Sequence, residues 1–118
     1  MEPLSLFKCL AEETRLKAVL LIHAQDELCV CELTAALNIS QPKVSRHLAQ
    51  LRDCGVLTTR REGQWMYYAI NTALPGWART IITATATDNV AVTYNCCERL
   101  TKMGDRPQRS RDLCGEPA

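Results

Sequence analysis

The sequence has no long apolar run and no excess of either charge, and both absences narrow its possible functions. No stretch reaches about 18 consecutive apolar residues, the length that a membrane-spanning helix needs. The N-terminus has no basic stretch followed by an apolar run, so we expect no secretory signal, no membrane partner and a cytoplasmic protein. The formal net charge is only +1, so global charge does not indicate nucleic-acid binding.

Cysteine, in contrast, is abundant. The chain of 118 residues contains seven, and because that number is odd they cannot all pair within one molecule. In a reducing compartment clustered cysteines more often bind metal or carry out redox chemistry. Cys9 lies among apolar residues, so we expect it to be a small buried hydrophobic residue. The length predicts one domain, residues 1–101, and the composition beyond it predicts a flexible tail, residues 102–118.

Residues 31–54 carry the pattern of two helices joined by a short turn. A helix over residues 31–37 is followed by a turn and by a second helix that ends at Cys54. We expect the Ser40 side chain to cap the second helix, and Gly55 to end it in a left-handed conformation. This is the helix-turn-helix arrangement.

The remaining pattern predicts a mostly α-helical protein with a β-hairpin. The expected elements are helices over residues 4–10, 12–24 and about 75–100, a polar connection at 25–27, and a hairpin over 56–70. A hairpin directly after a recognition helix is a wing, so the fold class is a winged helix-turn-helix. The last helix has more apolar positions than one small core needs, which suggests a dimer interface.

The second helix of the pair has the face that a helix in the DNA major groove requires. At ~100° per residue, Val44, Leu48 and Leu51 form a buried stripe, and the opposite side is small, polar and basic. His47 lies on the flank and fits a DNA contact and a satisfied boundary residue equally well. The candidate DNA-binding residues are Gln41, Lys43, Ser45, Arg46, His47 and Gln50 in this helix, with Arg60, Arg61 and Gln64 at the hairpin tip.

Cys29 and Cys31 form a C-x-C pair at the start of the first helix of the helix-turn-helix. The helix dipole favours a thiolate there, and a thiolate is a good ligand for soft metals. Side chains two apart on a regular helix point ~200° apart, so one thiophilic centre bound through both would bend or unwind that turn. Ligand and DNA would then compete for one backbone geometry. The spacing alone is equally compatible with two buried structural cysteines.

Four stretches together form a specific combination: L-F-K-C-L-A-E-E-T-R-L (6–16), E-L-C-V-C-E-L (27–33), S-Q-P-K-V-S-R-H-L (40–48) and G-Q-W-M-Y-Y (63–68). Within roughly residues 4–85 the chain resembles the ArsR/SmtB family of metal-responsive repressors, in particular its arsenic-responsive branch. The resemblance implies a homodimer, formed through the first and last helices, that represses an arsenic-resistance operon. It also implies that As(III) or Sb(III), bound by Cys29 and Cys31, acts as inducer, with no catalytic cofactor. A symmetric dimer is expected to read double-stranded operator DNA as an inverted repeat.

One departure from the family pattern concerns the third arsenic ligand. Many of these repressors have a cysteine three residues after the second ligand, and this chain has Thr34 there. The third ligand is then a cellular thiol or a cysteine from elsewhere, such as Cys96 or Cys97, and these two could also form a separate site for methylated arsenicals. Cys114 and Cys54 are weaker candidates. The last helix lacks the Asp/His pairs of zinc-sensing relatives.

Three alternatives remain open from the sequence. Oxidation of Cys29 with Cys31, or of Cys96 with Cys97, would make a thiol redox switch on the same fold. A thiol-dependent arsenate-processing enzyme is disfavoured because the chain has no C-x-x-C motif and no phosphate-type loop. A helix-turn-helix used only for protein contacts is disfavoured by the basic face of its second helix.

Overall fold

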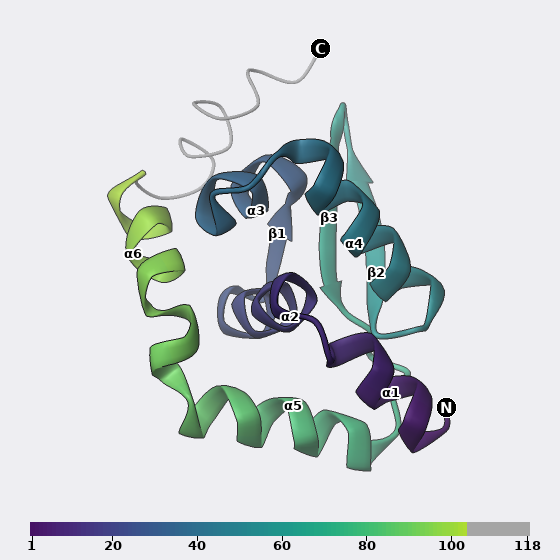
Figure 1. The fold of residues 1–118 in the computed structure, drawn as a ribbon. Helices are drawn as coiled ribbons and strands as arrows, with labels where there is room; N and C mark the ends of the chain where they lie inside the picture. Colours follow the sequence, from purple (N-terminus) through teal and green to yellow (C-terminus); the bar gives the residue numbers. More distant parts are fainter. Residues whose placement is uncertain (104–118) are drawn as a thin grey trace.

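The computed structural model describes residues 1–103, which form a mostly helical domain with a small sheet (Figure 1). In chain order the elements are α1 (Pro3–Leu10), α2 (Glu13–Gln25), β1 (Glu27–Cys29), α3 (Val30–Leu37), α4 (Gln41–Asp53), β2 (Leu57–Glu62), β3 (Trp65–Ile70), α5 (Gly76–Asp88), the 3-10 helix η1 (Val90–Thr93) and α6 (Tyr94–Lys102). The predicted winged helix-turn-helix class is confirmed. Apart from its first two residues, the predicted tail lies outside the described residues, and so does Cys114.

Helix α2 lies at the centre of the domain and forms much of its core (Figure 1). Five consecutive residues, from Ala18 to Ile22, are buried, as expected for a helix covered on most of its sides. It packs against α1, α4, α5 and β3. The predicted stripe on α4 is also buried in this core, since Val44, Leu48 and Leu51 are at most 1% exposed. None of the helices within residues 1–103 is both long and apolar enough to cross a membrane.

The sheet contains a strand that the sequence pattern did not predict. Residues 25–27 were expected to be a polar connection, but the chain reverses at Asp26, where φ is 71°, and β1 begins at Glu27. The sheet is antiparallel in the order β1-β3-β2, with Leu28 opposite Tyr68 and Cys29 opposite Tyr67. Strand β1 has only three residues, too few for the alternation of apolar and polar side chains that would predict a strand. Cys29 therefore lies at the end of an edge strand.

The ends of α4 confirm one capping prediction and correct another. Gly55 follows the helix with φ at 88°, the left-handed conformation that glycine adopts readily. Ser40 occupies the N-cap position, but its side chain makes no capping hydrogen bond. An N-cap side chain bonds the N–H of the second or third helical residue, and the second residue here is Pro42, which has no N–H.

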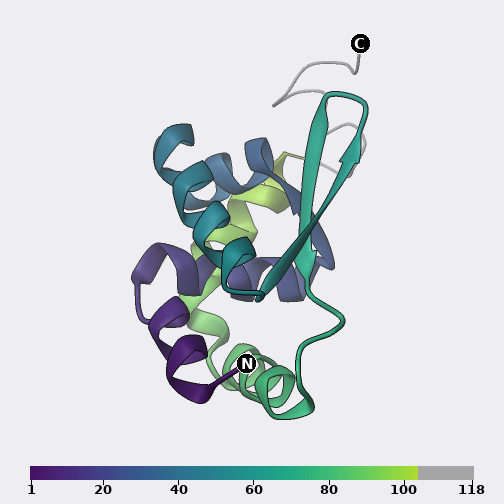
Figure 2. The same ribbon diagram turned by 90° about the vertical axis from the view of Figure 1, so that its right-hand side faces the viewer.

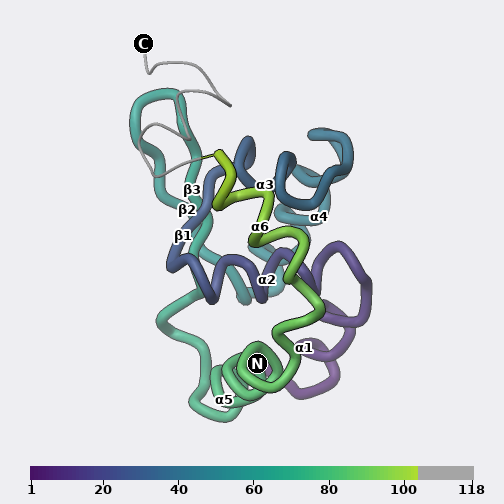
Figure 3. Tube along the Cα trace, turned by 90° about the vertical axis from the view of Figure 1, so that its left-hand side faces the viewer, coloured from purple at the N-terminus to yellow at the C-terminus, as the bar shows by residue number. Residues whose placement is uncertain are grey.

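The predicted long C-terminal helix is interrupted. Helix α5 ends at Asp88, and the chain passes through η1 before α6 begins at Tyr94. At the break the Asn89 amide donates a hydrogen bond to the Thr85 carbonyl, and a β-branched run follows, which disfavours a continuous helix. As a result α6 turns away from α5 and packs against α3 (Figures 1 and 3).

Candidate nucleic-acid interface and cysteine site

Helix α4 and the β2–β3 hairpin form one continuous side of the molecule. They contact each other, and the hairpin extends beyond the helices at its turn (Figure 2). Most of the predicted DNA-binding side chains on this side are exposed: Gln41, Lys43, Arg46, Gln50, Arg60, Arg61 and Gln64. Ser45 and His47 are half-buried. The arrangement places a basic helix face and a basic hairpin where one DNA duplex could contact both.

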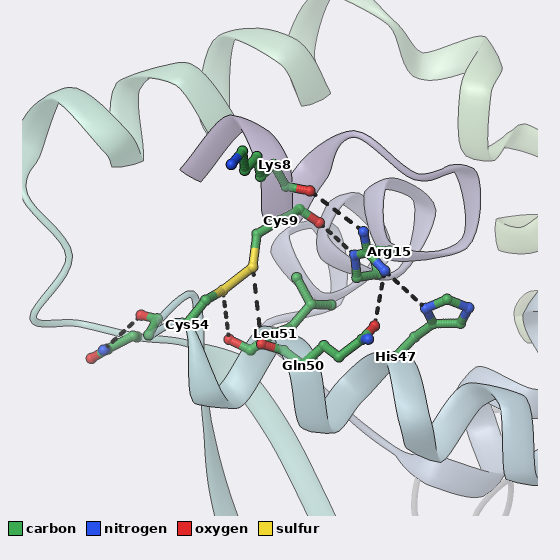
Figure 4. Close-up of a disulfide and its surroundings, with 9 residues drawn as sticks. Lys8, Cys9, Arg15, His47, Gln50, Leu51 and Cys54 are labelled. Carbon is green, nitrogen blue, oxygen red and sulfur yellow. Dashed lines mark hydrogen bonds between the residues drawn. A yellow bond between two sulfur atoms is a disulfide. The ribbon is translucent and has the colours of Figure 1, made fainter. Parts of the chain in front are cut away.

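His47 and Gln50 face the junction of α4 with α1 and α2. The Arg15 guanidinium donates to the Gln50 side-chain oxygen at 2.9 Å, and its Nη1 lies 3.3 Å from His47 Nδ1 (Figure 4). His47 Nδ1 is also 3.7 Å from a Glu12 carboxylate oxygen. These contacts favour the interpretation of His47 as a boundary residue with partners inside the protein over that of a DNA contact.

Arg60 does not lie at the hairpin tip. It is in the middle of β2, opposite Tyr67, and its guanidinium lies 4.8 Å from the Tyr67 ring centroid. The same group forms an ion pair with Glu27 of β1. Arg61 is exposed and forms no ion pair within residues 1–103, so it is the better-placed hairpin cation for a phosphate contact.

Cys9 and Cys54 are joined by a disulfide, which corrects the expectation that Cys9 is simply a buried hydrophobic residue (Figure 4). The bond connects the last turn of α1 to the residue that caps the C-terminal end of α4. Nearby, the Arg15 Nε donates to the Cys9 carbonyl oxygen at 2.7 Å. The two cysteines are 45 residues apart, and no local sequence pattern indicates such a pairing.

The C-x-C pair lies at the junction of the sheet and the helix-turn-helix. Cys29 ends β1 and is the N-cap of α3, with extended backbone (φ −86°, ψ 166°), and Cys31 is the second residue of the helix. The Cys29 sulfur accepts the Glu32 N–H, while the Glu32 carboxylate accepts the Cys29 N–H at 2.9 Å. The pair lies at the start of α3 as expected, but only Cys31 is within the helix, so the angle of ~200° between side chains two apart on a regular helix does not describe the pair.

The protonation of Cys29 also differs from the sequence-based expectation. Burial raises the pKa of the Cys29 thiol, and the negative charge of Glu32 adds to the increase, while the hydrogen bond from the Glu32 N–H opposes it. Cys29 is 1% exposed. The prediction of a dipole-stabilised thiolate is wrong for Cys29 in this structure, because loss of solvation outweighs the helix N-terminus.

A cavity of about 220 Å³ opens beside the two cysteines. It is lined by Cys29, Val30, Cys31, Gln41, Gln64, Trp65 and Met66. Gln41 is the first residue of α4, and Gln64 belongs to the hairpin turn. The cavity thus adjoins the cysteine pair, the recognition helix and the wing at once.

Cys96 and Cys97 lie on α6 and do not line the cavity beside the C-x-C pair. The Arg99 guanidinium contacts both the Cys96 sulfur and the carbonyl oxygen of Ala36, which is in the last turn of α3. Cys31 is in the first turn of α3, so the two cysteine pairs flank opposite ends of this helix. Cys96 is buried and Cys97 is half-buried. Within residues 1–103, no three His, Cys, Asp or Glu side chains are grouped as a metal site.

Sequence reasoning did not single out two residues of this region. Glu32 is fully buried and completes the cap with Cys29, and the motif C-x-x-E, read as a capping box with cysteine in place of serine, could have indicated it. Trp65 lines the cavity and is 8% exposed. Its alternation with Met66 along β3 did not indicate that it would lie beside the cysteines.

Comparison with known proteins agrees with the fold and identifies the family. Residues 12–59 match the family model described as bacterial regulatory protein, arsR family. Two proteins of Pseudomonas putida, the arsenic resistance transcriptional regulators ArsR1 and ArsR2, are 48% and 49% identical to the chain. ArsR1 aligns over 92% of this chain and 84% of its own length, and ArsR2 over 95% and 97%.

Solved structures show the same architecture. HlyU from Vibrio cholerae aligns with a TM-score of 0.66 and 30% identity, over 76% of this chain and 99% of that one. The family and these Pseudomonas relatives are transcriptional regulators, which excludes the enzyme alternative. From residue pattern, fold and relatives alike, the chain belongs to the arsR family of bacterial regulatory proteins.

Proposed function

We propose that this chain is a repressor of arsenical resistance that binds operator DNA through α4 and the hairpin, and that As(III) or Sb(III) bound at Cys29 and Cys31 releases it. The names of its Pseudomonas relatives support the biological role. One observation carries the mechanism: the cavity beside the two cysteines is also lined by Gln41 of α4 and Gln64 of the hairpin turn. A ligand there meets both DNA-binding elements.

The neutral state of Cys29 is compatible with this chemistry. Arsenous acid exchanges an As–OH bond for an As–S bond when it meets a thiol, and the thiol proton leaves with the hydroxide as water. No thiolate has to form beforehand, so the raised pKa of Cys29 does not prevent binding. A second exchange, at Cys31, releases a second molecule of water after cellular thiols have reduced the disulfide in which the Cys31 sulfur is engaged.

Release of DNA follows from the position of Cys29 in the cap of α3. Its sulfur accepts the Glu32 N–H in the described state. A new bond to arsenic draws on the same sulfur and pulls it toward Cys31, so the cap and the start of α3 must adjust. Helix α3 packs against α4, and this contact transmits the adjustment to the recognition helix.

A homodimer is supported by apolar side chains at one end of the molecule. Helices α1 and α5 lie at the end opposite the hairpin tip (Figures 1 and 2). They expose Leu4, Phe7 and Trp77, which are 61%, 50% and 39% accessible. Pairing through this end would leave two hairpins and two α4 helices free to contact the half-sites of an inverted repeat.

The test is fluorescence anisotropy of the labelled promoter DNA of its own operon, titrated with arsenite. Wild type should bind the DNA and leave it when arsenite is added. The double variant Cys29→Ser/Cys31→Ser should bind and stay, while Cys97→Ser, which changes a half-buried cysteine that does not line the cavity, should behave as wild type. Equal release of wild type and the double variant would move the inducer site elsewhere.

A second candidate, a thiol redox response, is favoured by the Cys9–Cys54 disulfide. Two thiols and a hydroperoxide give a disulfide, water and an alcohol (water for hydrogen peroxide), and the bond would fix α1 to the end of α4. The same DNA assay with peroxide in place of arsenite tests it, with Cys9→Ser as the variant. Peroxide-dependent binding that Cys9→Ser abolishes would support this function.

A further inference from the structure

The Arg15 guanidinium connects the end of α1 to the recognition helix α4. Its Nε donates to the Cys9 carbonyl oxygen at 2.7 Å, and its Nη2 donates to the Lys8 carbonyl oxygen at 3.4 Å. Both carbonyls belong to the last turn of α1, where a helix offers them no partner of its own. The remaining nitrogen, Nη1, donates to the Gln50 side-chain oxygen of α4 at 2.9 Å (Figure 4). Arg15 is therefore held by α1 and itself holds a side chain of α4.

The surroundings of Arg15 leave this contact little freedom to rearrange. The Arg15 backbone N–H donates to the Glu12 carboxylate at 2.9 Å, which caps the first turn of α2. On the other side, the Cys9–Cys54 disulfide joins the same end of α1 to the end of α4. The guanidinium thus reaches Gln50 from a frame that α1, α2 and α4 build together.

The contact decides which part of the Gln50 amide is available to a ligand. A guanidinium carries only donors, so the amide atom that faces it must be the oxygen. The amide nitrogen, with its two N–H groups, lies on the far side of the amide from the guanidinium, and the residue is exposed (Figure 4). Gln50 therefore presents donors outward and keeps its acceptor turned toward Arg15.

This orientation excludes one kind of base contact and favours another. A glutamine that reads an adenine edge uses both amide groups, because its oxygen accepts from N6 and its nitrogen donates to N7. Phosphate oxygens, and the N7 and O6 atoms of guanine, are acceptors only. A glutamine whose oxygen is engaged within the protein matches these acceptors and does not match adenine.

A hollow beside the contact has the charge that an acceptor of this kind requires. Its volume is about 340 Å³, and it is lined by Ser5, Lys8, Cys9, Arg15 and Gln50. Two of these five residues are cationic. Positive charge next to the amide donor favours a DNA phosphate over a neutral base edge.

We propose that Arg15 is a positioning residue for DNA recognition: by engaging the Gln50 oxygen, it makes Gln50 a donor to an acceptor-only group of the operator. That group is a phosphate oxygen or a guanine edge, and it is not adenine. The inference rests on the proposed function and concerns its DNA-binding side alone, so it does not depend on the cysteine site. Arg15 acts through Gln50 and needs no contact with the DNA.

A double-mutant cycle on DNA binding tests the coupling. Dissociation constants for the promoter DNA of its own operon are measured by anisotropy for wild type, Arg15→Met, Gln50→Ala and the double variant. Gln50→Ala should weaken binding about fivefold in wild type, the effect of one hydrogen bond, and less than about twofold when Arg15 is already methionine. A purely structural role of Arg15 would lower the stability of the fold and leave the cost of Gln50→Ala unchanged.

Two further backgrounds control for charge and for position. Lys17 is another basic residue of α2, and its ammonium pairs with Glu13. In Lys17→Met, the Gln50→Ala change should still cost about fivefold in affinity. Arg15→Lys keeps the positive charge but replaces the planar fork by a single ammonium, so it should behave as Arg15→Met does. Urea unfolding of each variant establishes that it is folded at the temperature of the binding assay.

A second measurement needs no substitution at Arg15 and distinguishes the possible acceptors. Wild type and Gln50→Ala are titrated with operators that carry one methylphosphonate, one 7-deazaguanine or one 7-deazaadenine, at each position in turn. An analogue that weakens binding of wild type but not of Gln50→Ala marks the group that Gln50 contacts. We expect a methylphosphonate position, and a 7-deazaguanine position would support the same donor role at a base.

The outcomes separate this inference from the proposed function. A 7-deazaadenine position, or an equal cost of Gln50→Ala with and without Arg15, would overturn the role of Arg15 while DNA binding itself stood. Unchanged affinity in Gln50→Ala would overturn it as well. Failure of wild type to bind the promoter DNA of its own operon would instead overturn the proposed function.

Discussion

Cys29 and Glu32 cap the first turn of α3 reciprocally: the Cys29 sulfur accepts the Glu32 N–H, and the Glu32 carboxylate accepts the Cys29 N–H at 2.9 Å. Serine or threonine usually fills the first of these roles. In the proposed function the Cys29 sulfur would serve both as a structural cap and as a ligand of the metalloid. The proposed ligand site therefore lies at the start of the helix-turn-helix.

Removal of the Glu32 cap should weaken the fold. Glu32→Ala leaves the buried Cys29 N–H without its acceptor, so we expect the free energy of unfolding in urea to fall by about 1–3 kcal/mol. Glu32→Gln keeps an oxygen acceptor and is the control that should lose less. Equal losses in the two variants would mean that the carboxylate charge matters more than the hydrogen bond.

The Cys29 thiol should make stability depend on pH in the alkaline range. Burial raises the pKa of this thiol in the folded protein. Its contribution to stability is thus complete below the pKa of the unfolded chain, roughly 8.5, and is lost as the pH rises through the folded-state value. Between about pH 7 and about pH 10 the unfolding free energy should fall more steeply in wild type than in Cys29→Ser. Parallel curves would contradict this expectation.

The basic residues of the DNA-binding side should differ in importance. Arg46 is exposed on α4, and Arg46→Ala should weaken specific operator binding by about 1–3 kcal/mol if it contacts a base. Arg61→Ala should weaken binding to all sequences and lower the salt dependence, as loss of a phosphate contact does. Arg60→Ala should affect binding less than either, because its guanidinium is engaged with Glu27. Anisotropy titrations at several salt concentrations measure all three, and a loss in Arg60→Ala equal to that in Arg46→Ala would refute this ranking.

The disulfide should stabilise the isolated domain. It closes a loop between residues 45 apart, so its reduction should lower the free energy of unfolding by about 2–4 kcal/mol. Cys9→Ser and Cys54→Ser should each reproduce that loss without reductant, and Cys97→Ser should not. The comparison is made by urea unfolding with and without dithiothreitol, and identical midpoints would show that the bond is absent in solution.

The features predictable from the sequence were those set by neighbouring residues. The buried stripe of Val44, Leu48 and Leu51 follows from helix periodicity, and the end of α4 follows from the conformational freedom of Gly55. The C-x-C pair was recognised because its two cysteines are close in sequence. The position of Cys29 at the end of a β-strand was not predicted.

The features missed depend on contacts between distant parts of the chain. Arg60 meets Glu27 across 33 residues, and Cys9 meets Cys54 across 45. The state of Cys29 likewise depends on burial against Trp65 and Tyr67, which no pattern near residue 29 encodes. Solvation of a thiol is a property of the folded core, and the helix-dipole argument could not account for it.

In the strand order β1-β3-β2, the strand that ends at Cys29 is an edge strand and pairs directly with β3, the central strand. Strands β3 and β2 together form the wing. A two-stranded ribbon twists more strongly and is less stable than a three-stranded sheet. If arsenic draws Cys29 away from Tyr67, β1 separates from β3, and the remaining two-stranded hairpin twists more strongly. The angle at which the hairpin approaches DNA would then depend on how many strands the sheet retains.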